Sequence, residues 1–397
     1  MKLLVAADAH IFRTPDGAYW CKSIYGYEFW KRYLNVFDDV KIVARVKDVP
    51  KLEIKKLRVD GEHVQVSGIP FFQGPMGLLK NYLKIQNSLK GIDLDCDAAL
   101  MRMPSQTASM VYDHLRKDIP VAGEIVYDMM DDVNQPGQGM VLKILNTITS
   151  NRLKKFCIQA NGVSYVTKYT IQKHYPCFSM VNGETKEHFH TDYSTITLSE
   201  DAFEKPINFK EKNSLIMVIS SVSMNSNRKG ERIVIQIVKK CRDRGCNVSA
   251  IIIGDGKLRK SFETYAKELG VEDYVKFTGL LPSSDEVREV MKLADIYVFP
   301  TQGEGLPRGI IEAMALGMPV LSTPVGGIPE LINNEYLFDP NDSDGFADMI
   351  EKLLENTQLL TKMSYDNFQK SQEFKNDILQ KKRDDFYKKL RNLASNE

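Results

Sequence analysis

The sequence lacks the cysteine patterns of a zinc site or a disulfide scaffold. Its six cysteines, in 397 residues, include no CxxC pair and no cluster with histidine. Structural zinc sites and secreted disulfide frameworks depend on such spacing, so neither is expected and a reducing, cytoplasmic location is favoured. The six histidines show no metal-ligand spacing either. We therefore expect no metal site.

Long apolar runs are also missing. No segment reaches the roughly 18 consecutive apolar residues of a membrane-spanning helix. The first ten residues, MKLLVAADAH, carry too short an apolar run for a signal peptide and no small-residue cleavage pattern. A formal net charge of +1 gives no global field that would attract nucleic acid. Residues 1–190 carry 25 basic and 20 acidic side chains, so the first half alone is mildly basic.

The sequence does contain short apolar runs that alternate with longer helical patterns, which is typical of parallel α/β sheets. The expected strands are Leu3–Ala7, Val40–Arg45, Val64–Ile69, Ala98–Met103, Val121–Tyr127, Gly162–Thr167, Leu215–Ser220, Val248–Gly254, Val275–Thr278, Ile296–Pro300, Val320–Ser322 and Tyr336–Phe338. The expected helices include Tyr25–Val36, Gly77–Leu89, Thr107–Lys117, Glu231–Arg244, Lys257–Leu269, Ser284–Leu293 and Arg308–Leu316, with helical patterns from Ser343 to Leu393.

These elements form two series, separated by a polar stretch around Thr191–Lys212 that contains Pro206. A chain of this length exceeds what a single hydrophobic core serves. We predict an α/β protein with two doubly wound, Rossmann-like domains that face a cleft. They comprise residues 1–195 and 196–375, and a C-terminal helix, 376–397, crosses back to the first domain. Ligands of such sheets bind beyond the carboxyl ends of the strands, so residues just after strands are the candidates for a site.

One such segment, TQGEGLPRGIIEAMALG, begins at Thr301. It follows an apolar strand and combines a glycine-rich loop with a helix that Pro307 starts and Gly317 ends. The free N–H groups and the dipole of a helix N-terminus suit an anion, and a phosphate is the obvious guest. Glu304 and Glu312 flank this anion site, where a carboxylate aimed at phosphate would repel it.

The two glutamates are therefore better suited to neutral hydroxyls on either side of a phosphate. Glu312 lies one turn into the helix, and helical side chains lean back toward the N-terminus, so it could reach a ribose. Glu304, in the loop, could reach a sugar. A nucleotide sugar presents hydroxyl, diphosphate and hydroxyl in that order. Alternatively, the pair is a solvated loop residue and a surface helix residue, and the two glutamates alone do not distinguish these readings.

The surrounding segments make the assignment specific. EGLPRGIIEAMALGMPVLSTPVGGIPELI (Glu304–Ile332) resembles the signature of the family-four glycosyltransferases, also called glycosyl transferases group 1, which are retaining enzymes of GT-B fold. Four further segments resemble motifs of that family in the expected order: VNGETKEHF, NRKG, IIIGDGKLRKSFE and VKFTGLL. The resemblance is strong over Val181–Pro340 and weak over Met1–Ala160.

The resemblance implies a role for each matched residue in binding the donor. Lys229 would contact the diphosphate, with Arg228 as a helper, Glu304 would bind donor-sugar hydroxyls and Glu312 the ribose. A cation at Lys229 also suits the chemistry, because a leaving diphosphate gains charge at the transition state. The remaining implied donor-site residues are Gly254, Leu280 in the segment Phe277–Leu281 beside the base, and Gly305, Leu306, Pro307, Arg308 and Gly309 of the loop and helix start.

The sequence departs from the family pattern at two places. Many relatives carry an arginine a few residues before the lysine, whereas SSVSMNSN (Ser220–Asn227) has none. Either Arg228 substitutes for it or phosphate binding is weaker. The commoner EGFG reads EGLP here and is followed by Arg308, which could touch phosphate or pair with a neighbouring acid.

In the first domain, the stretch Asp8–Phe29 is expected to be the loop after the first strand, where relatives place a glycine loop near the donor phosphate. Only Asp16–Gly17 remains of it, so Gly17 is the candidate, with an ordinary turn as the alternative. The aromatic residues that follow could stack an acceptor sugar or pack in the core. They are Tyr19, Trp20, Tyr25, Tyr27, Phe29 and Trp30.

Asp128 follows another expected strand, where relatives often carry a histidine or an acid close to the reacting sugar. It could orient the acceptor hydroxyl, accept its proton or cap a loop. We take Glu304, Lys229 and Asp128 as the candidate catalytic residues. IDLDCD (Ile92–Asp97) contains a DxD, a metal motif of the other major glycosyltransferase fold. It precedes a strand instead of following one, so it is interpreted as a solvated turn.

The predicted function is transfer of a sugar from a nucleotide sugar, with UDP favoured, to a glycan or lipid-linked acceptor hydroxyl with retention of configuration and without a metal or cofactor. Cell-surface polysaccharide or glycoconjugate synthesis is the expected setting. The alternatives are a nucleotide-sugar 2-epimerase of the same fold and a non-catalytic nucleotide-sugar-binding module. Met76–Lys90 and Val141–Phe156 mix basic and apolar residues. These helices either rest peripherally on an anionic membrane at its inner face or face the core with a fringe of lysines.

Overall fold

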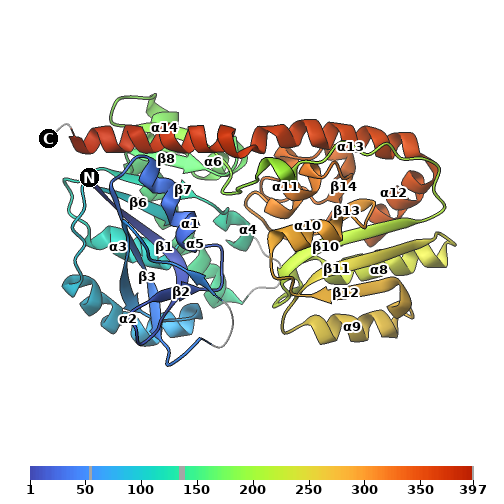
Figure 1. Ribbon diagram of the computed structural model, residues 1–397, viewed down its shortest axis with the longest axis horizontal. Coiled ribbons are helices and arrows are strands. Elements are labelled where there is room, and N and C mark those ends of the chain that lie inside the picture. Colours follow the sequence, from blue (N-terminus) through green and yellow to red (C-terminus); the bar gives the residue numbers. More distant parts are fainter. Residues whose placement is uncertain (53–55, 134–138, 396–397) are drawn as a thin grey trace. The chain divides into compact units, whose positions relative to one another are not determined.

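The computed structural model describes residues 1–52, 56–133 and 139–395. They divide into two compact units, each with its own sheet (Figure 1). Unit 1 comprises Met1–Tyr193 and Gln380–Glu397, and unit 2 comprises Ser194–Leu379. The last helix of the chain therefore belongs largely to the first unit.

The sheet of unit 1 is mainly parallel. Its strands run in the order β5-β3-β1-β6-β7-β8-β9, and the short β2 and β4 extend it antiparallel from the far end of β1. The strands are β1 (Lys2–Arg13), β2 (Tyr19–Cys21), β3 (Asp39–Asp48), β4 (Leu57–Arg58), β5 (Val64–Pro70), β6 (Ala98–Met103), β7 (Val121–Ile125), β8 (Gly162–Tyr165) and β9 (Phe189–Asp192). Strand order reverses between β1 and β6, which makes their carboxyl ends the switch point of this unit.

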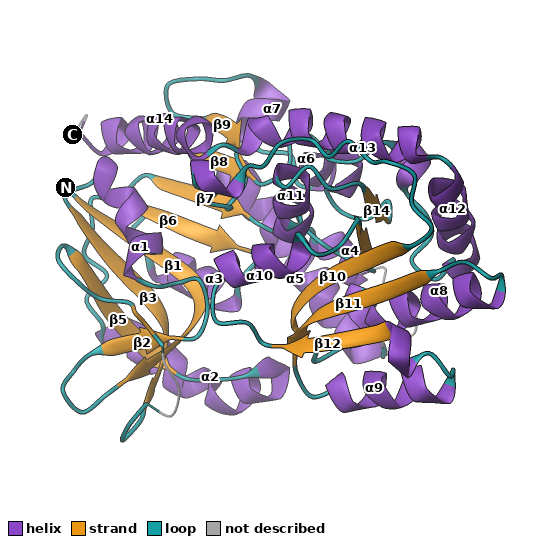
Figure 2. Cartoon of the chain, turned by 45° about the vertical axis from the view of Figure 1, so that its right-hand side comes forward, coloured by secondary structure: helices purple, strands orange, loops and turns teal. Residues whose placement is uncertain are grey.

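The helices of unit 1 are α1 (Tyr27–Trp30), α2 (Gly74–Gly91), α3 (Gln106–His114), α4 (Met129–Val133), α5 (Met140–Gln159), α6 (Thr170–His174), α7 (Phe178–Asn182) and α14 (Asn376–Ser395). Right-handed crossovers into β6, β7 and β8 place α2, α3 and α5 on one face of the sheet. Contacts agree with this arrangement, because α2 touches α3, and Tyr112 of α3 packs edge-on against Phe156 of α5. Figure 2 shows these helices in purple beside the orange strands.

A buried polar cluster attaches α14 to the sheet of unit 1. One carboxylate oxygen of Glu124, on β7, accepts hydrogen bonds from the hydroxyls of Tyr387 (2.7 Å) and Tyr193 (2.9 Å). Its other oxygen accepts from Arg102 and from the Tyr33 hydroxyl (3.3 Å). The side chains of Glu124 and Arg102 are only 3% and 4% exposed. We call these five residues the Glu124 cluster.

Unit 2 contains a five-stranded parallel sheet in the order β12-β11-β10-β13-β14. Its strands are β10 (Leu215–Ser223), β11 (Val248–Asp255), β12 (Val275–Gly279), β13 (Ile296–Phe299) and β14 (Val320–Ser322). Its helices are α8 (Glu231–Asp243), α9 (Arg259–Glu268), α10 (Ser284–Met291), α11 (Arg308–Ala315), α12 (Ser343–Glu355) and α13 (Thr357–Ser371). The strands are almost wholly buried because helices flank the sheet, which explains their continuous apolar runs.

Two expectations about local structure are wrong. Asp8–Arg13 is not loop but the continuation of β1, which breaks register with β3 between Ala6 and His10 and then pairs with β2 in a hairpin. Alternation of apolar and polar residues in DAHIFR fits a strand of this kind. Tyr336–Phe338 is not a strand: a 3₁₀ turn, Asn334–Tyr336, precedes a single bridge from Leu337 to Ser322.

Candidate functional site

The loops after β10 and β13 meet at the switch point of unit 2. These strands pair in parallel, and strand order reverses between them. The backbone carbonyl of Arg228, in the first loop, accepts hydrogen bonds from the Gln302 N–H (2.9 Å) and the Thr301 hydroxyl (3.1 Å) of the second. The candidates of the two loops, 75 residues apart in the sequence, are therefore held side by side.

Lys229 and Glu304 form a direct ion pair across these loops. The Lys229 Nζ lies 2.5 Å from the Glu304 Oε1 and 5.3 Å from the centroid of the Phe299 ring. Their side chains are 39% and 17% exposed, so both can be reached from solvent. The sequence did not predict this contact. In this pair, Lys229 neutralises the Glu304 carboxylate beside the start of α11.

Two glycines allow these loops to approach one another. A Cβ at Gly230, where φ is +91°, would lie 2.3 Å from the carbonyl oxygen of Pro300. A Cβ at Gly326, where φ is +51°, would lie 1.8 Å from the carbonyl oxygen of Glu304. Both positions combine a left-handed backbone with a backbone neighbour that cannot move aside. Because neither glycine has a side chain, the backbone next to Lys229 can pack against Pro300, and the backbone around Gly326 can pack against Glu304.

Helix α11 begins beside this pair. Its first helical residue is Arg308, as predicted, with Pro307 as the N-cap, and no side chain caps the helix. In the described part of the chain, no protein acceptor receives the N–H groups of Gly305, Leu306, Arg308 or Gly309. Arg308 is exposed and makes no ion pair with a described acid. Four backbone donors without a protein acceptor and an exposed guanidinium thus lie at the start of α11, a combination that suits an anion.

Glu312 lies one turn into α11 and is partly buried. Burial raises the pKa of its carboxyl, and the charges of Arg308 and Arg288 oppose that rise. The helix can lie this close to β13 because Gly309 has no side chain: a Cβ there would lie 2.5 Å from the Tyr297 hydroxyl oxygen. No described residue forms a hydrogen bond or ion pair with the Glu312 carboxyl, which lies one turn from the start of α11.

Gly254 and Leu280 lie at the same edge of the sheet. Gly254 is near the end of β11, which pairs with β10, and Leu280 directly follows β12, one strand farther out. The Leu280 side chain is 62% exposed, which is high for an aliphatic residue. The carboxyl edge of unit 2 thus carries an exposed apolar side chain, a cation, the start of α11 and two carboxylates.

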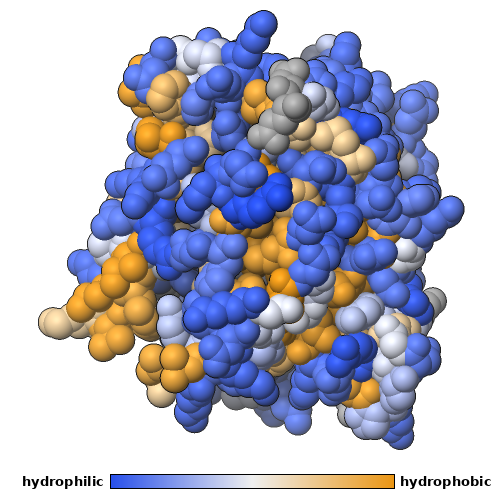
Figure 3. All heavy atoms as spheres, turned by 90° about the vertical axis from the view of Figure 1, so that its left-hand side faces the viewer, coloured by the Kyte–Doolittle hydropathy of each residue, from blue (hydrophilic) through white to orange (hydrophobic). Residues whose placement is uncertain are grey.

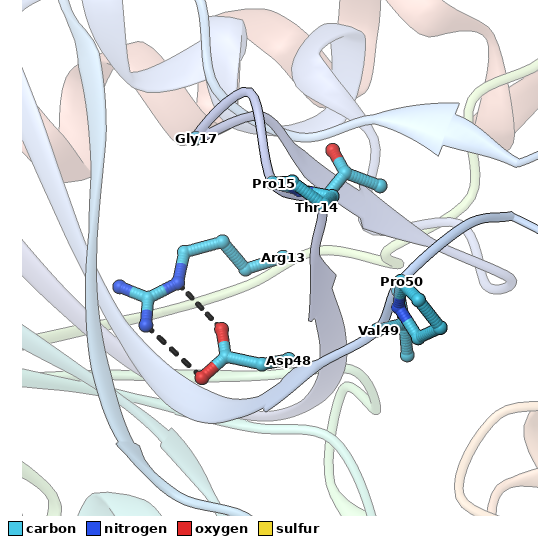
Figure 4. A pocket seen from close by; sticks show the side chains of 7 residues that line it. All are labelled: Arg13, Thr14, Pro15, Gly17, Asp48, Val49 and Pro50. Atoms are coloured by element: carbon cyan, nitrogen blue, oxygen red, sulfur yellow. Dashed lines mark hydrogen bonds and ion pairs between the residues drawn. The ribbon is translucent and has the colours of Figure 1, made fainter.

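In unit 1, Gly17 occupies the turn of the β1–β2 hairpin. The turn is closed by hydrogen bonds from Gly17 N–H to the Thr14 carbonyl and from Thr14 N–H to the Ala18 carbonyl. A φ of +83° accounts for glycine here without any ligand. Gly17 also lines an open pocket of about 590 Å³ beside Arg13, whose guanidinium is held by Asp48 at 2.6 and 3.1 Å (Figure 4). That arginine is already paired.

The carboxylate of Asp128 makes two contacts at the carboxyl end of β7. Its Oδ1 accepts from the Met130 N–H at 2.8 Å, which caps α4. Its Oδ2 lies 2.7 Å from the Nδ1 of His174, at the end of α6. The Asp128 side chain is 2% exposed and the His174 side chain 45%. Because a carboxylate only accepts, Nδ1 carries the proton of this hydrogen bond, and Nε2 is the ring nitrogen left without this partner. Sequence reasoning missed His174.

Sequence reasoning also missed a group of polar side chains at the switch point of unit 1. Asp8, in the irregular part of β1, accepts from the Thr107 hydroxyl (3.2 Å) and pairs with Arg45 (2.9 Å). Arg45 is buried on β3, and its charge adds to burial in lowering the pKa of His10. The available signal was the polar pair Asp8 and His10 directly after an apolar run.

The acids of Ile92–Asp97 lie at the opposite edge, before β6. Asp93 pairs with Lys41, and Asp97 accepts from the Lys2 N–H at 2.6 Å. Among the residues that the structure describes, no three histidine, cysteine, aspartate or glutamate side chains gather as they would around a metal ion. These acids thus stabilise the starts of strands.

Comparison with known proteins agrees with this geometry. The sequence model of the family described as "Glycosyl transferases group 1" matches residues 200–370, nearly the whole of unit 2. Unit 2 is thus similar to the glycosyl transferases group 1 family over most of its length. The match spans both loops and all of α11, so it includes every candidate of unit 2.

Similarity to known proteins also extends beyond unit 2. Protein CapJ of Staphylococcus aureus is 28% identical over 389 residues, 93% of each chain. Sucrose-phosphate synthase from Thermosynechococcus elongatus superposes with a TM-score of 0.74 over 100% of both chains at 14% identity. Anabaena HepE, solved in complex with UDP, gives a TM-score of 0.60 over 96% of this chain and 98% of that one at 18% identity. The likeness establishes the GT-B fold for both units.

Proposed function

We propose that this glycosyltransferase moves a sugar from a UDP-sugar to a hydroxyl of a glycan or lipid-linked acceptor, with retention of configuration, in the synthesis of a cell-surface polysaccharide. The observation that carries the proposal is the Lys229–Glu304 pair at the N-terminus of α11. Similarity over 138 residues, at 31% identity, to the putative colanic acid biosynthesis glycosyltransferase WcaL of Escherichia coli supports the polysaccharide setting, and the UDP complex of HepE supports the choice of base. We further propose a cytoplasmic enzyme in peripheral contact with an anionic membrane.

Binding of the donor would replace the contact between Lys229 and Glu304 with contacts from each residue to the donor. The diphosphate takes the free N–H groups of α11 and the ammonium of Lys229, and Glu304 then accepts hydrogen bonds from hydroxyls of the donor sugar. Glu312 accepts from the ribose, and Leu280 lies beside the base. Lys229 and the helix dipole stabilise the charge that the diphosphate gains as it leaves. These groups supply that stabilisation without a metal or cofactor.

In the proposed reaction the bond from the anomeric carbon to the diphosphate oxygen breaks and the bond to the acceptor oxygen forms on the same face. The acceptor proton passes to an oxygen of the leaving diphosphate. NMR analysis of the product anomer tests this step. A product with the donor's configuration is expected, and an inverted linkage would exclude the scheme.

The acceptor would be bound by unit 1, with His174 contacting one of its hydroxyls and Asp128 positioning the imidazole. His174→Ala is expected to raise the acceptor KM by roughly tenfold, the value of one lost hydrogen bond. Binding of UDP, measured by calorimetry, should not change. The exposed His63→Ala serves as control, since its ring pairs with Asp39 on the surface. An unchanged acceptor KM in His174→Ala would remove the residue from the site.

A panel of nucleoside diphosphates tests the donor class. Ligand binding to the native state at about 100 times Kd stabilises it by about 2.7 kcal/mol, so the thermal midpoint should rise by several degrees with UDP. GDP and ADP are the comparison compounds. A larger rise with GDP would replace UDP as the base, and no rise with any nucleotide would contradict a donor site on unit 2. Turnover of the UDP-sugar to its 2-epimer without acceptor would indicate an epimerase instead.

A further inference from the structure

Two helices of unit 1 expose apolar side chains where a protein surface is normally polar. On α2, Met76, Leu79 and Leu83 are 65%, 71% and 78% exposed. On α5, all six large apolar side chains from Met140 to Ile148 are 40% exposed or more. Together with Tyr82 these are ten side chains on two helices, and unit 2 has only five such residues in its described part. The core-facing arrangement considered for these helices is thus wrong for their N-terminal halves.

The same two helices contain no acid. Their 38 residues carry seven basic side chains, Lys80, Lys84, Lys90, Lys143, Arg152, Lys154 and Lys155, and no aspartate or glutamate. The whole protein carries 52 acids, almost as many as its 53 basic residues, so their absence from this stretch is specific. Lys80, Lys84 and Lys143 are exposed and pair with no described carboxylate. Only Arg152 is neutralised, by Asp113 at 2.5 Å.

The basic and apolar side chains share one stripe instead of opposing faces. On α2, Met76, Leu79, Lys80, Leu83 and Lys84 follow the i, i+3, i+4 spacing of a single helix face, while Ile85 and Leu89 are buried behind them. Hydrophobic side chains reach the molecular surface in patches next to hydrophilic ones (Figure 3). A stripe of this composition suits a phase that is anionic at its surface and apolar just beneath.

We propose that α2 and α5 form a docking surface for the anionic face of a lipid bilayer. Apolar side chains would enter the headgroup region while the lysines contact anionic headgroups, each lysine adding attraction that salt screens. The helices would lie on the membrane without crossing it, since none in the described residues is long and apolar enough to span a bilayer.

The position of this surface in unit 1 matches the proposed acceptor side. The C-termini of α2 and α5 lead into the starts of β6 and β8, so their N-terminal halves lie toward the carboxyl edge of the sheet. Asp128 and His174 are at that same edge. Resting on the proposed function, this places a lipid-linked saccharide within reach of unit 1. The docking surface itself depends on no nucleotide or sugar, so it is tested separately.

The test is flotation of the full-length protein with vesicles of phosphatidylcholine alone or of phosphatidylcholine with phosphatidylglycerol, in low and moderate salt. Binding to the anionic vesicles, weakened by salt, is expected. The triple variant K80Q/K84Q/K143Q should bind about a hundredfold more weakly, at roughly fivefold per lysine. L79S/L83S should also lose binding. The matched controls are K260Q/K267Q/K276Q and Leu293→Ser, exposed positions of unit 2, which should bind like wild type.

Absence of binding to anionic vesicles would overturn the proposal, as would binding that both K80Q/K84Q/K143Q and L79S/L83S retain. Light scattering in the absence of lipid tests the alternative partner for this surface, which is a second copy of the chain. A dimer that L79S/L83S converts to monomer, with no flotation of the wild type, would assign the surface to self-association. The thermal unfolding midpoints of all variants should match that of wild type because the changed side chains are exposed. If L79S/L83S unfolds, L79N/L83N takes its place.

Discussion

Lys229→Ala is expected to lower kcat/KM for sugar transfer by about 10²–10³-fold, and Glu304→Ala to abolish detectable transfer. The first value is that of one preorganised group that stabilises charge on a leaving oxygen. The two residues touch in the free protein, so removing either also changes the other: without Glu304, Lys229 remains an unneutralised cation beside α11. UDP should therefore bind Glu304→Ala as tightly as wild type or more tightly, and Lys229→Ala more weakly.

This opposite effect on binding distinguishes a catalytic role from a structural one. Loss of a merely structural ion pair would affect both variants alike. Transfer rates with saturating UDP-sugar, and UDP affinity by calorimetry, are the measurements. Lys260→Ala, an exposed lysine of α9, is the matched control. Full transfer activity in Lys229→Ala would contradict the role given to this residue.

Glu124→Ala is expected to destabilise the protein by about 3–5 kcal/mol, because it leaves Arg102 buried without its partner. The same change removes the acceptor of three tyrosine hydroxyls and so weakens the attachment of α14 to the sheet. Tyr387→Phe removes a single hydrogen bond and should cost only about 0.5–1.5 kcal/mol.

Denaturant unfolding, followed by circular dichroism, measures both changes. Asp384→Ala is the control on the same helix, since its carboxylate accepts from the neutral amides of Asn35 and Gln380 and pairs with no described cation. A transition midpoint of Glu124→Ala equal to that of wild type would show that the Glu124 cluster does not contribute to stability. Retained UDP binding by Tyr387→Phe would show that the cluster acts on stability and not on the donor site.

Much of the fold follows from local sequence. Buried parallel strands such as β6 and β14 appear as continuous apolar runs, and their observed limits match the predicted ones. The strands that the sequence did not predict, β2, β4 and β9, have only two to four residues, and pairing with neighbours determines them more than their own composition does. The sequence predicts that β1 ends at Ala7, because Asp8 interrupts its apolar run, whereas the strand continues to Arg13.

The contacts of the site were less predictable than its residues. Motif and spacing brought out Lys229, Glu304 and Glu312, but their mutual geometry depends on strand order, which places β10 beside β13. His174 is 46 residues from Asp128 and belongs to no recognisable motif. Tyr387 is 263 residues from Glu124. Such pairs become visible only when the chain folds.

The exposure of α2 and α5 was ambiguous for a related reason. Apolar residues at helical spacing indicate an apolar face but do not say what covers it. The buried face of α2 needs only residues such as Ile85 and Leu89, so Leu79 and Leu83 remain outside. Composition gave the better signal, since a stretch rich in lysine and free of acid differs from an ordinary solvated helix.

The central claim is that the diphosphate of the donor binds the start of α11 and Lys229, while the glutamates bind the flanking hydroxyls. Calorimetric titration with UDP and 2′,3′-dideoxy-UDP tests it most directly, using wild type, Lys229→Ala and Glu312→Gln. One UDP site per chain is expected, weakened about 10–100-fold by Lys229→Ala, in the range of a lost charge-assisted hydrogen bond. Dideoxy-UDP lacks the ribose hydroxyls, so it should bind wild type and Glu312→Gln with equal affinity. That affinity should be the same as the weakened affinity of Glu312→Gln for UDP. UDP affinities that neither substitution changes would contradict the account.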